Sequence, residues 1–210
     1  MGSKERRERE REELRGKILE AARELFATEG YEAVTMRKIA QRIEYSPTAI
    51  YLHFKDKLAV MRALCDTDFL ALARQFHKIA AIADPIERIR AAGRAYAAFA
   101  FAHPNHYRLM FMTSHPHETV EESAIEQGNP DQDAYAFLRL AVEQAIASGR
   151  FRPSVTDPDL IAQLFWSGLH GLIALQCTHC DDPWVTWKPR EELVERMMDA
   201  LLTGLAAVKG

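Results

Sequence analysis

The sequence predicts an all-α protein in two parts: a three-helix unit near the N-terminus that contains a helix-turn-helix, and a helical bundle behind it. Apolar residues recur at helical spacing in most of the long segments, and no stretch alternates apolar and polar residues as a strand would. Several segments open with Ser or Asp followed by Pro, which favours the start of a helix. With 210 residues, 48% of them hydrophobic, the chain can bury a substantial core.

The N-terminal unit is predicted over residues 1–57 and begins with a flexible charged arm at residues 1–11. The arm mixes Lys and Arg with Glu, which is typical of a solvated extension of a helix. From Leu14 the apolar residues follow a helical period as far as Gly30, which suits the end of a helix.

The segment from Thr35 to Lys57 predicts two short helices joined by a tight turn at Glu44 and Tyr45. Thr35 can cap the first helix, and Ser46 followed by Pro is a strong start for the second. The apolar residues of both helices face each other, whereas the second helix offers its other face to a partner. Asp56 can then cap a third helix. This is a helix-turn-helix whose second helix has the size for a DNA major groove. The outward residues of the second helix are Thr48, Tyr51, Leu52 and His53.

The order of residues in this segment resembles the DNA-binding motif of the TetR/AcrR family of bacterial transcription regulators. The family usually has Gly in the turn, where this chain has Glu44. If that position requires a positive φ, Glu costs on the order of 1 kcal/mol there. The matching positions are Thr35, Ile39, Ala40, Ser46, Ile50, Tyr51, His53, Phe54 and Lys57.

We expect two kinds of contact with double-stranded DNA. Tyr51, Lys57 and the backbone amides near Asp56 are expected at phosphates, which fix register without reading sequence. Thr48, Ser46 and Arg37 are expected at base edges. The predicted DNA-binding residues are Thr35, Arg37, Ser46, Thr48, Tyr51, His53, Lys55 and Lys57.

Charge is weakly segregated along the chain. Residues 1–57 hold 13 Lys and Arg against 11 Asp and Glu, so they carry +2, and the remaining residues carry −5 of the total of −3. DNA binding therefore depends on where a few cations stand rather than on the global field. A basic arm that reaches a minor groove is the alternative to a merely solvated arm.

Residues 58–210 are predicted to form a bundle. Helices are expected from about 56 to 79, 84 to 103, 106 to 112, 131 to 149, 156 to 175 and 190 to 208, with a mostly exposed loop at 113–130. The stretch from Leu160 to Leu175 is apolar almost all round, so one side is expected to face the domain core and the other a partner subunit. The predicted interface of this homodimer is Leu160, Leu164, Gly168, Gly171, Leu172, Val194, Met197, Met198, Leu201 and Leu205.

The segment from Trp166 to Gly171, WSGLHG, resembles the W-H-G signature in the C-terminal domain of one TetR subgroup. The resemblance implies an all-helical domain that dimerises through its last two long helices and often holds a small-molecule pocket. A core Trp and a hydrogen-bonded core His are the alternative for Trp166 and His170. The predicted ligand-binding residues are Tyr96, Phe99, Tyr107, Phe111, Phe137, Trp166 and His170.

No catalytic motif and no cofactor site is found, so an enzyme is not expected. Three cysteines, an odd number, together with the absence of a signal peptide, indicate a reducing cytoplasm. No membrane span is expected, because no run of 18 apolar residues is free of charge. We therefore expect a cytoplasmic repressor that a small, largely apolar effector releases from a palindromic operator. The alternatives are a thiol- or metal-responsive regulator that uses Cys177 and Cys180, and a constitutive DNA binder without an effector; no metal site is assigned.

Overall fold

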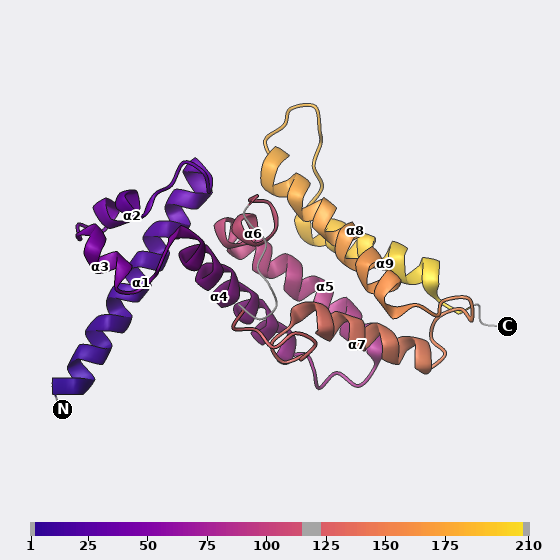
Figure 1. The fold of residues 1–210 in the computed structure, drawn as a ribbon. Coiled ribbons are helices and arrows are strands. Elements are labelled where there is room, and N and C mark those ends of the chain that lie inside the picture. The colour runs from indigo at the N-terminus through magenta and orange to yellow at the C-terminus, as the bar shows by residue number, and fades with distance from the viewer. Residues whose placement is uncertain (1–2, 115–122, 208–210) are drawn as a thin grey trace. The chain divides into compact units, whose positions relative to one another are not determined.

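The computed structural model describes residues 3–114 and 123–207, which are helical apart from loops and one isolated β-bridge (Figure 1). The all-α prediction is confirmed. The helices are α1 (Ser3–Glu29), α2 (Met36–Arg42), α3 (Pro47–Tyr51), α4 (Lys57–His77), α5 (Pro85–Ala102), α6 (Pro104–Phe111), α7 (Ala134–Ala147), α8 (Pro158–His179) and α9 (Arg190–Leu205).

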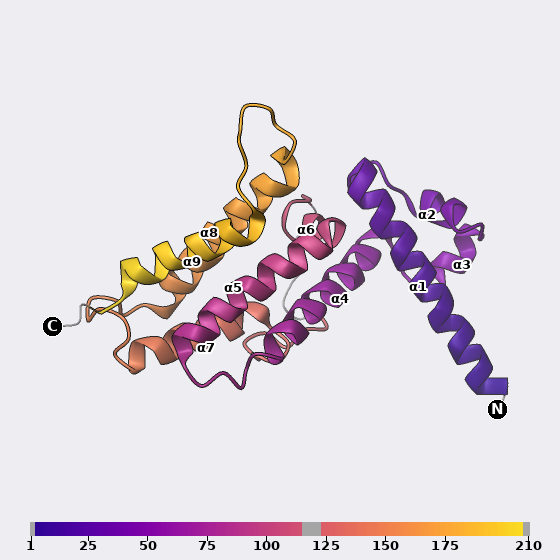
Figure 2. The ribbon, with the colours of Figure 1, turned by 180° about the vertical axis from the view of Figure 1, so that it is seen from behind.

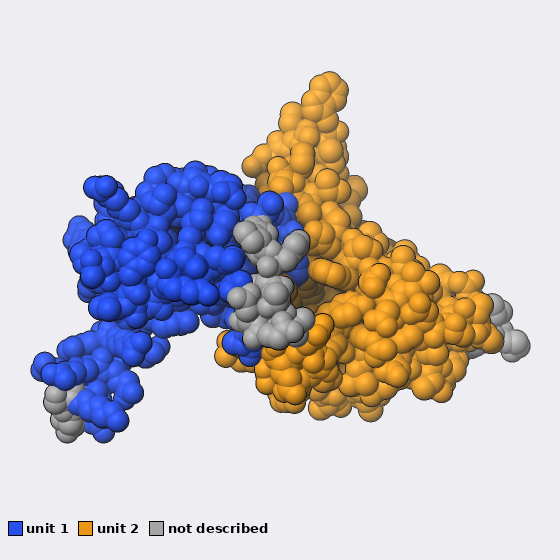
Figure 3. Space-filling model, viewed as in Figure 1, with its two compact units in different colours: residues 1–68, 105–124 blue, residues 69–104, 125–210 orange. Residues whose placement is uncertain are grey.

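The chain divides into two compact units, which Figure 3 colours separately. Unit 1 comprises residues 1–68 and 105–124, and unit 2 comprises residues 69–104 and 125–210. This division falls inside α4, whereas the domain boundary predicted from the sequence, between residues 57 and 58, stays a prediction.

Unit 1 is built on short-range caps that the sequence specifies. The Thr35 Oγ1 accepts the Lys38 N–H at 3.2 Å to open α2, and the Ser46 Oγ accepts the Ala49 N–H at 3.2 Å to open α3. The carboxylate of Asp56 accepts the Ala59 N–H at 2.7 Å at the start of α4. These bonds satisfy backbone donors that a helix start leaves orphaned. The core that they position includes Ile18, Ala22, Phe26, Ile39 and Ile50, all buried.

Three local features of unit 1 can be compared with the sequence prediction: the start of α1, its end, and the turn between α2 and α3. Residues 3–11 are the first turns of α1, because the segment is rich in helix-forming Glu and Arg. Gly30 ends α1 with φ of +81°, as expected. Glu44 adopts φ of +60°, a left-handed conformation that costs a non-glycine residue on the order of 1 kcal/mol.

A buried ion cluster joins three helices of unit 1. Asp68 of α4 is 1% exposed, and one of its carboxylate oxygens accepts a hydrogen bond from the guanidinium of Arg23 on α1, which is 6% exposed. The other oxygen lies 2.9 Å from the Nδ1 of His106 on α6. The Asp68 carboxylate is thus the shared acceptor that fixes α1, α4 and α6 to one another.

Unit 2 is a bundle in which α5 packs against α7, α8 and α9, and α8 packs between α7 and α9 (Figures 1 and 2). Gly93 of α5 lies against α8 and α9: a Cβ there would stand 2.7 Å from the Sδ of Met198 and 3.0 Å from a methyl of Leu169, so these side chains would have to shift. α8 continues to His179, beyond the predicted end at Leu175, because no helix breaker follows Leu175. α7 begins after its cap Asp133, three residues later than predicted.

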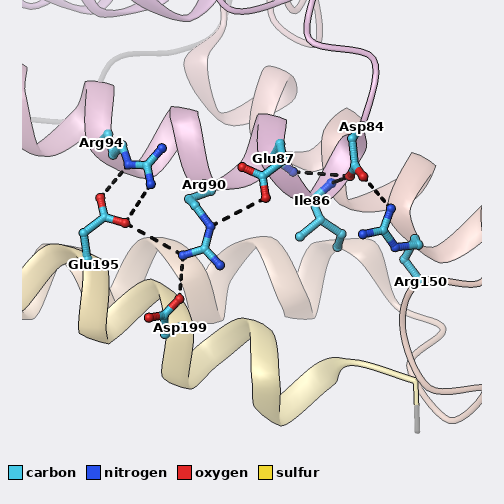
Figure 4. A network of polar contacts seen from close by, with 8 residues as sticks. All are labelled: Asp84, Ile86, Glu87, Arg90, Arg94, Arg150, Glu195 and Asp199. Carbon is cyan, nitrogen blue, oxygen red and sulfur yellow. Dashed lines mark hydrogen bonds and ion pairs between the residues drawn. The ribbon is translucent and has the colours of Figure 1, made fainter. Parts of the chain in front are cut away.

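Charged residues line the seam between α5 and α9 (Figure 4). The Arg94 guanidinium makes two hydrogen bonds to Glu195, at 2.5 and 2.8 Å, and Arg90 lies 2.7 Å from Asp199. The Arg94 hydrogen bonds hold the pKa of the Glu195 carboxyl below its ordinary value. The seam fixes how α9 lies on α5 and therefore which residues of α9 stay at the surface.

Among the described helices, α8 alone is long and apolar enough to cross a membrane by length and composition. The core helix of a soluble bundle passes the same test, and α8 packs against α5, α7 and α9. This feature therefore gives only weak support for a membrane span. The predicted loop at 113–130 lies partly outside the described residues.

Candidate functional site

The outward face of the α2–α3 pair carries most of the residues predicted to contact DNA. Arg37, Thr48, Tyr51 and Lys55 are exposed. Thr35 and Ser46 are exposed as well, although their oxygens are engaged in caps. Each hydroxyl proton is still able to donate to a phosphate or a base edge, because a hydroxyl accepts and donates at once.

Lys57 has a role inside unit 1 that the sequence did not reveal. Its ammonium donates to the Tyr31 carbonyl at 2.7 Å and lies 4.1 Å from the centre of the Tyr31 ring. These contacts fasten the start of α4 to the segment between α1 and α2. A phosphate contact by Lys57 therefore draws on an ammonium that is already hydrogen-bonded to the protein.

Two apolar side chains beside the predicted contacts were missed as candidates. Leu52 is 73% exposed and Tyr45 is 41% exposed, at either end of α3. Leu52 was noted on the outward face but was not assigned to the site. An exposed Leu beside exposed Thr48 and Tyr51 suits apolar contact with a thymine methyl in the major groove.

The surroundings of His53 favour the neutral form of its imidazole. Burial lowers the pKa of its imidazole, and the positive charges of Arg11 and Arg15 on α1 lower the pKa further. The guanidinium of Arg15 also lies over the ring of Phe54, 5.0 Å from its centre. The N-terminal part of α1 therefore faces the segment that follows α3.

In unit 2, three of the predicted ligand residues form one hydrogen-bonded cluster. The Trp166 Nε1–H donates to the Tyr96 Oη at 3.2 Å, and the same Oη lies 3.2 Å from the Nδ1 of His170. Because the indole only donates, the Tyr96 Oη accepts from Trp166, and its phenol proton is able to donate to Nδ1. In the tautomer in which Nδ1 accepts, the imidazole proton resides on Nε2. Burial lowers the pKa of His170, which favours this neutral form.

The cluster is neither fully buried nor purely apolar. Trp166 is 39% exposed, so it is not an ordinary core Trp. The Tyr135 ring lies 6.2 Å from the Trp166 ring, and the Tyr135 Oη–H donates to Asp159 at 3.1 Å. Tyr135 and Asp159 were not among the predicted ligand residues; helical spacing to Trp166, on the same helix, would have pointed to Asp159.

The remaining predicted ligand residues are divided between the two units. Phe99 is buried in unit 2, as is Phe137, whose ring packs 5.3 Å from that of Phe76. Tyr107 and Phe111 belong to α6 in unit 1 and pack against each other at 5.2 Å.

The residues predicted for a dimer interface separate into two groups. Val194 and Met198 are buried inside the subunit and offer no surface to a partner, because the α5–α9 seam turns them toward α5. Met197 and Leu201 flank Gly168 of α8. The interface residues that keep some surface are Leu160, Leu164, Gly168, Gly171, Leu172, Met197, Leu201 and Leu205.

The cysteines form no metal cluster within the described part of the chain. Cys177 is half-buried and Cys180 is exposed. Across residues 3–114 and 123–207 no group of three His, Cys, Asp or Glu side chains is arranged to hold a metal ion.

The exposed α2–α3 pair on a three-helix unit, joined to a separate helical bundle, defines a helix-turn-helix DNA-binding protein. Comparison with known families agrees. Residues 18–64 match the family described as "Bacterial regulatory proteins, tetR family", and residues 89–201 match "Tetracyclin repressor-like, C-terminal domain". The chain belongs to the TetR family of DNA-binding transcriptional regulators, which are not enzymes.

Two curated relatives differ in the sign of their action. The chain is similar to the HTH-type transcriptional activator FasR of Mycolicibacterium smegmatis, at 34% identity over 48% of this chain and 47% of FasR. It is similar to the HTH-type transcriptional repressor AcnR of Corynebacterium diphtheriae, at 43% identity over 29% of this chain and 28% of AcnR. The chain thus spans less than half the length of each relative.

Solved structures of the family resemble almost the whole chain. PfmR, a TetR family regulator of Thermus thermophilus, has a TM-score of 0.68 and 25% identity, covering 90% of this chain and 99% of PfmR. The fatty acid degradation regulator FadR of Bacillus halodurans has a TM-score of 0.71 at 18% identity, covering 91% of this chain and 95% of FadR, and shows the fold alone.

Proposed function

We propose that this protein is a cytoplasmic repressor that binds a palindromic operator as a homodimer and is released by a small, largely apolar effector. Residues 1–57 form the reading head and residues 58–210 bind the effector and the partner subunit. The W-H-G type of C-terminal domain is the proposed subgroup, with Trp166, His170 and Gly171 as its signature. The observation that carries the effector part is the partly exposed cluster of Tyr96, Trp166 and His170.

The cluster suits an apolar molecule that carries one hydrogen-bond acceptor. Trp166 supplies an aromatic plane, and the neutral His170 supplies an Nε2–H donor. The Nε2–H donor of His170 carries a partial positive charge, so it disfavours a cationic effector beside it. Because α4 contributes residues to both units, its orientation is the coordinate that the effector biases. Tenfold release of the operator requires only about 1.4 kcal/mol of coupling between the two sites.

The effector proposal is tested with matched Trp variants. Trp166→Ala is expected to lower the affinity for an effector, found by a thermal-shift screen of apolar carbonyl compounds and acyl thioesters, by more than it lowers affinity for DNA. Trp184→Ala is the control, since Trp184 is 94% exposed on the α8–α9 loop and lies outside the cluster. Equal ligand response in the wild type and Trp166→Ala would contradict the assignment.

The base-reading assignment is tested at Thr48. Thr48→Ala is expected to change the preference among operator variants, whereas Tyr51→Phe weakens all of them alike. Uniform weakening by Thr48→Ala would show that Thr48 only positions the head.

The homodimer accounts for the apolar side of α8 that the subunit leaves uncovered. Leu160, Leu164 and Leu175 are exposed along α8, and Leu160 is 54% exposed. With Gly168 and Gly171 between them, this face suits close packing with the α8–α9 pair of a second copy. The two-fold symmetry of such a dimer then places the two half-sites of the operator about one turn of the DNA duplex apart. Sedimentation at micromolar concentration tests this, and a monomer that binds operator tightly would contradict it.

A constitutive DNA binder is the second candidate. Phe99 and Phe137 are already buried by the protein itself, which is what a filled core without an effector would display. The absence of any thermal shift across the effector screen, with tight operator binding retained, would favour this candidate.

A further inference from the structure

The first turns of α1 extend the reading head as a rigid helix. α1 runs without interruption from Ser3 to Glu29, and every residue from Lys4 to Glu13 is exposed. The first side chain of α1 that is buried is that of Ile18. Figures 1 and 2 both show the N-terminal end of α1 projecting away from α2 and α3.

The cations of this extension are sorted onto one side of the helix. Lys4, Arg7, Arg11 and Arg15 are spaced by three, four and four residues, which places them in one stripe at 3.6 residues per turn. The same series continues to Ile18 and then to Ala22, which are both fully buried in the core of unit 1. The stripe therefore lies on the side of α1 that faces the helix-turn-helix. The acidic residues of the extension stand at the edge of the stripe or on the other sides: Glu5, Glu8, Glu10, Glu12 and Glu13.

Two independent observations support the direction of the stripe. The Arg15 guanidinium lies over the Phe54 ring, so the inner end of the stripe touches the segment that follows α3. The charge of Arg11 is felt at His53, one residue before Phe54. Among the described residues no ion pair involves Lys4, Arg7 or Arg11, whereas Arg6, on another side of the helix, pairs with Glu10 at 3.3 Å. In the described part of α1, these three cations therefore take part in no ion pair with the acids of their own helix.

We propose that Lys4, Arg7 and Arg11, here called the basic rail, bind the phosphate backbone of duplex DNA beside the segment that α3 reads. This rests on the proposed role of α3 in the reading head. From Lys4 to Arg15 the stripe is roughly 17 Å long, comparable with about five base-pair rises of 3.4 Å. Phosphate contacts of this kind carry no sequence information and add affinity and register. They also explain how a head with a net charge of only +2 holds a polyanion: its cations are concentrated where the backbone passes.

The test compares two triple variants that remove the same charge from opposite sides of α1. The rail variant is Lys4→Gln, Arg7→Gln and Arg11→Gln, and the control is Arg6→Gln, Arg9→Gln and Lys17→Gln. Gln is a good helix former and all six positions are exposed, so circular dichroism and melting temperature are expected to match the wild type. The probe is mixed-sequence duplex DNA, because non-specific binding reports phosphate contacts without requiring an operator.

Affinity is measured by fluorescence anisotropy as a function of salt concentration. Loss of three phosphate contacts is expected to reduce the slope of log affinity against log salt by about 2.7 per head in the rail variant, and by less than about 1 in the control. Equal salt slopes for the rail variant and the control variant would overturn the proposal, because the cations would then contribute to DNA affinity regardless of their side of α1. A wild-type slope in the rail variant would overturn it as well.

The outcome for the rail is separable from the outcome for the reading head. If the wild type binds mixed duplex and selects an operator, but the rail variant is unchanged, only the rail is refuted. If the wild type binds no duplex at all, the reading head is refuted together with the rail. Selectivity gives a second readout: the rail variant is expected to keep the ratio of operator to mixed-sequence affinity, and a fall in this ratio would contradict a backbone role.

Discussion

Removal of the buried charge of Asp68 is expected to be among the most damaging single changes in unit 1. Asp68→Asn keeps the size of the side chain but leaves the buried Arg23 guanidinium with only the exposed Glu20, 3.7 Å from its Nε, as a counter-charge. Breaking one partner of a buried ion pair costs about 3–5 kcal/mol of unfolding free energy. For a chain of this size, that corresponds to a fall in melting temperature on the order of 10 °C. His106 adds little to the cost, because its ring is partly exposed and can be hydrated.

The control for Asp68→Asn is Glu29→Gln, which also converts one acid of an ion pair in unit 1 to an amide. Glu29 pairs with Lys38 at 2.6 Å, but the two side chains are 36% and 46% exposed, so the expected loss is below about 1 kcal/mol. Urea unfolding is followed by far-ultraviolet circular dichroism, which reports both units. Tryptophan fluorescence reports unit 2, since all three Trp residues lie there.

Two results would refute this reasoning. One is a loss for Asp68→Asn no larger than that for Glu29→Gln, which would mean that water reaches the pair. The other concerns Arg23→Met combined with Asp68→Leu. Replacing both charges by apolar groups is expected to recover most of the stability. A double variant as unstable as Asp68→Asn would show that the unpaired charge of Arg23 is not the cause of the lost stability.

Three further outcomes are expected. Glu44→Gly should raise the free energy of unfolding by on the order of 1 kcal/mol in urea titrations, because it relieves the left-handed φ, and a loss of stability would mean that the Glu side chain holds the turn. Burial lowers the pKa of His170 below its ordinary 6.5, so the unfolded chain binds a proton more readily than the folded chain. The stability of the protein should therefore fall as the pH drops below 6.5. In melting curves, His170→Gln should reduce this pH dependence. Arg11→Gln should raise the pKa of His53 toward its ordinary value in a proton NMR titration, only in part because burial is the larger cause, and an unchanged pKa would place Arg11 away from His53.

The starts of α2, α3, α5 and α8 were determined by the sequence alone, because a cap is a contact over two or three residues. Thr35, Ser46, Asp84 and Asp157 each accept N–H groups just ahead of them, and no distant residue is needed to form these bonds. The left-handed φ at Glu44 was raised as a possibility by the family resemblance, because the family usually has Gly at that position. The caps and the apolar spacing predicted the helix-turn-helix, and the family resemblance then supplied the class of protein.

The faces that helices present were decided by the tertiary structure. Helical period shows that Val194, Met197, Met198 and Leu201 lie on one broad side of α9, but not which neighbour covers each of them. The α5–α9 seam and the missing Cβ of Gly93 turn Met198 inward, whereas Met197 lies against α8. In the same way, Lys57 reads as a free cation in sequence and is bound to the Tyr31 carbonyl in the fold.

The charged N-terminal segment shows both what the sequence determines and what only the tertiary structure decides. Its composition suggested a solvated arm, because interleaved Lys, Arg and Glu average to little net charge along the chain. Only a continuous helix sorts these charges by side, and only the packing of Ile18 and Ala22 fixes which side faces the reading head. The sequence supplies periodicity and local bonds, which act within a few residues. Burial and the direction of a surface depend on residues far apart in the chain, so they follow from the tertiary structure alone.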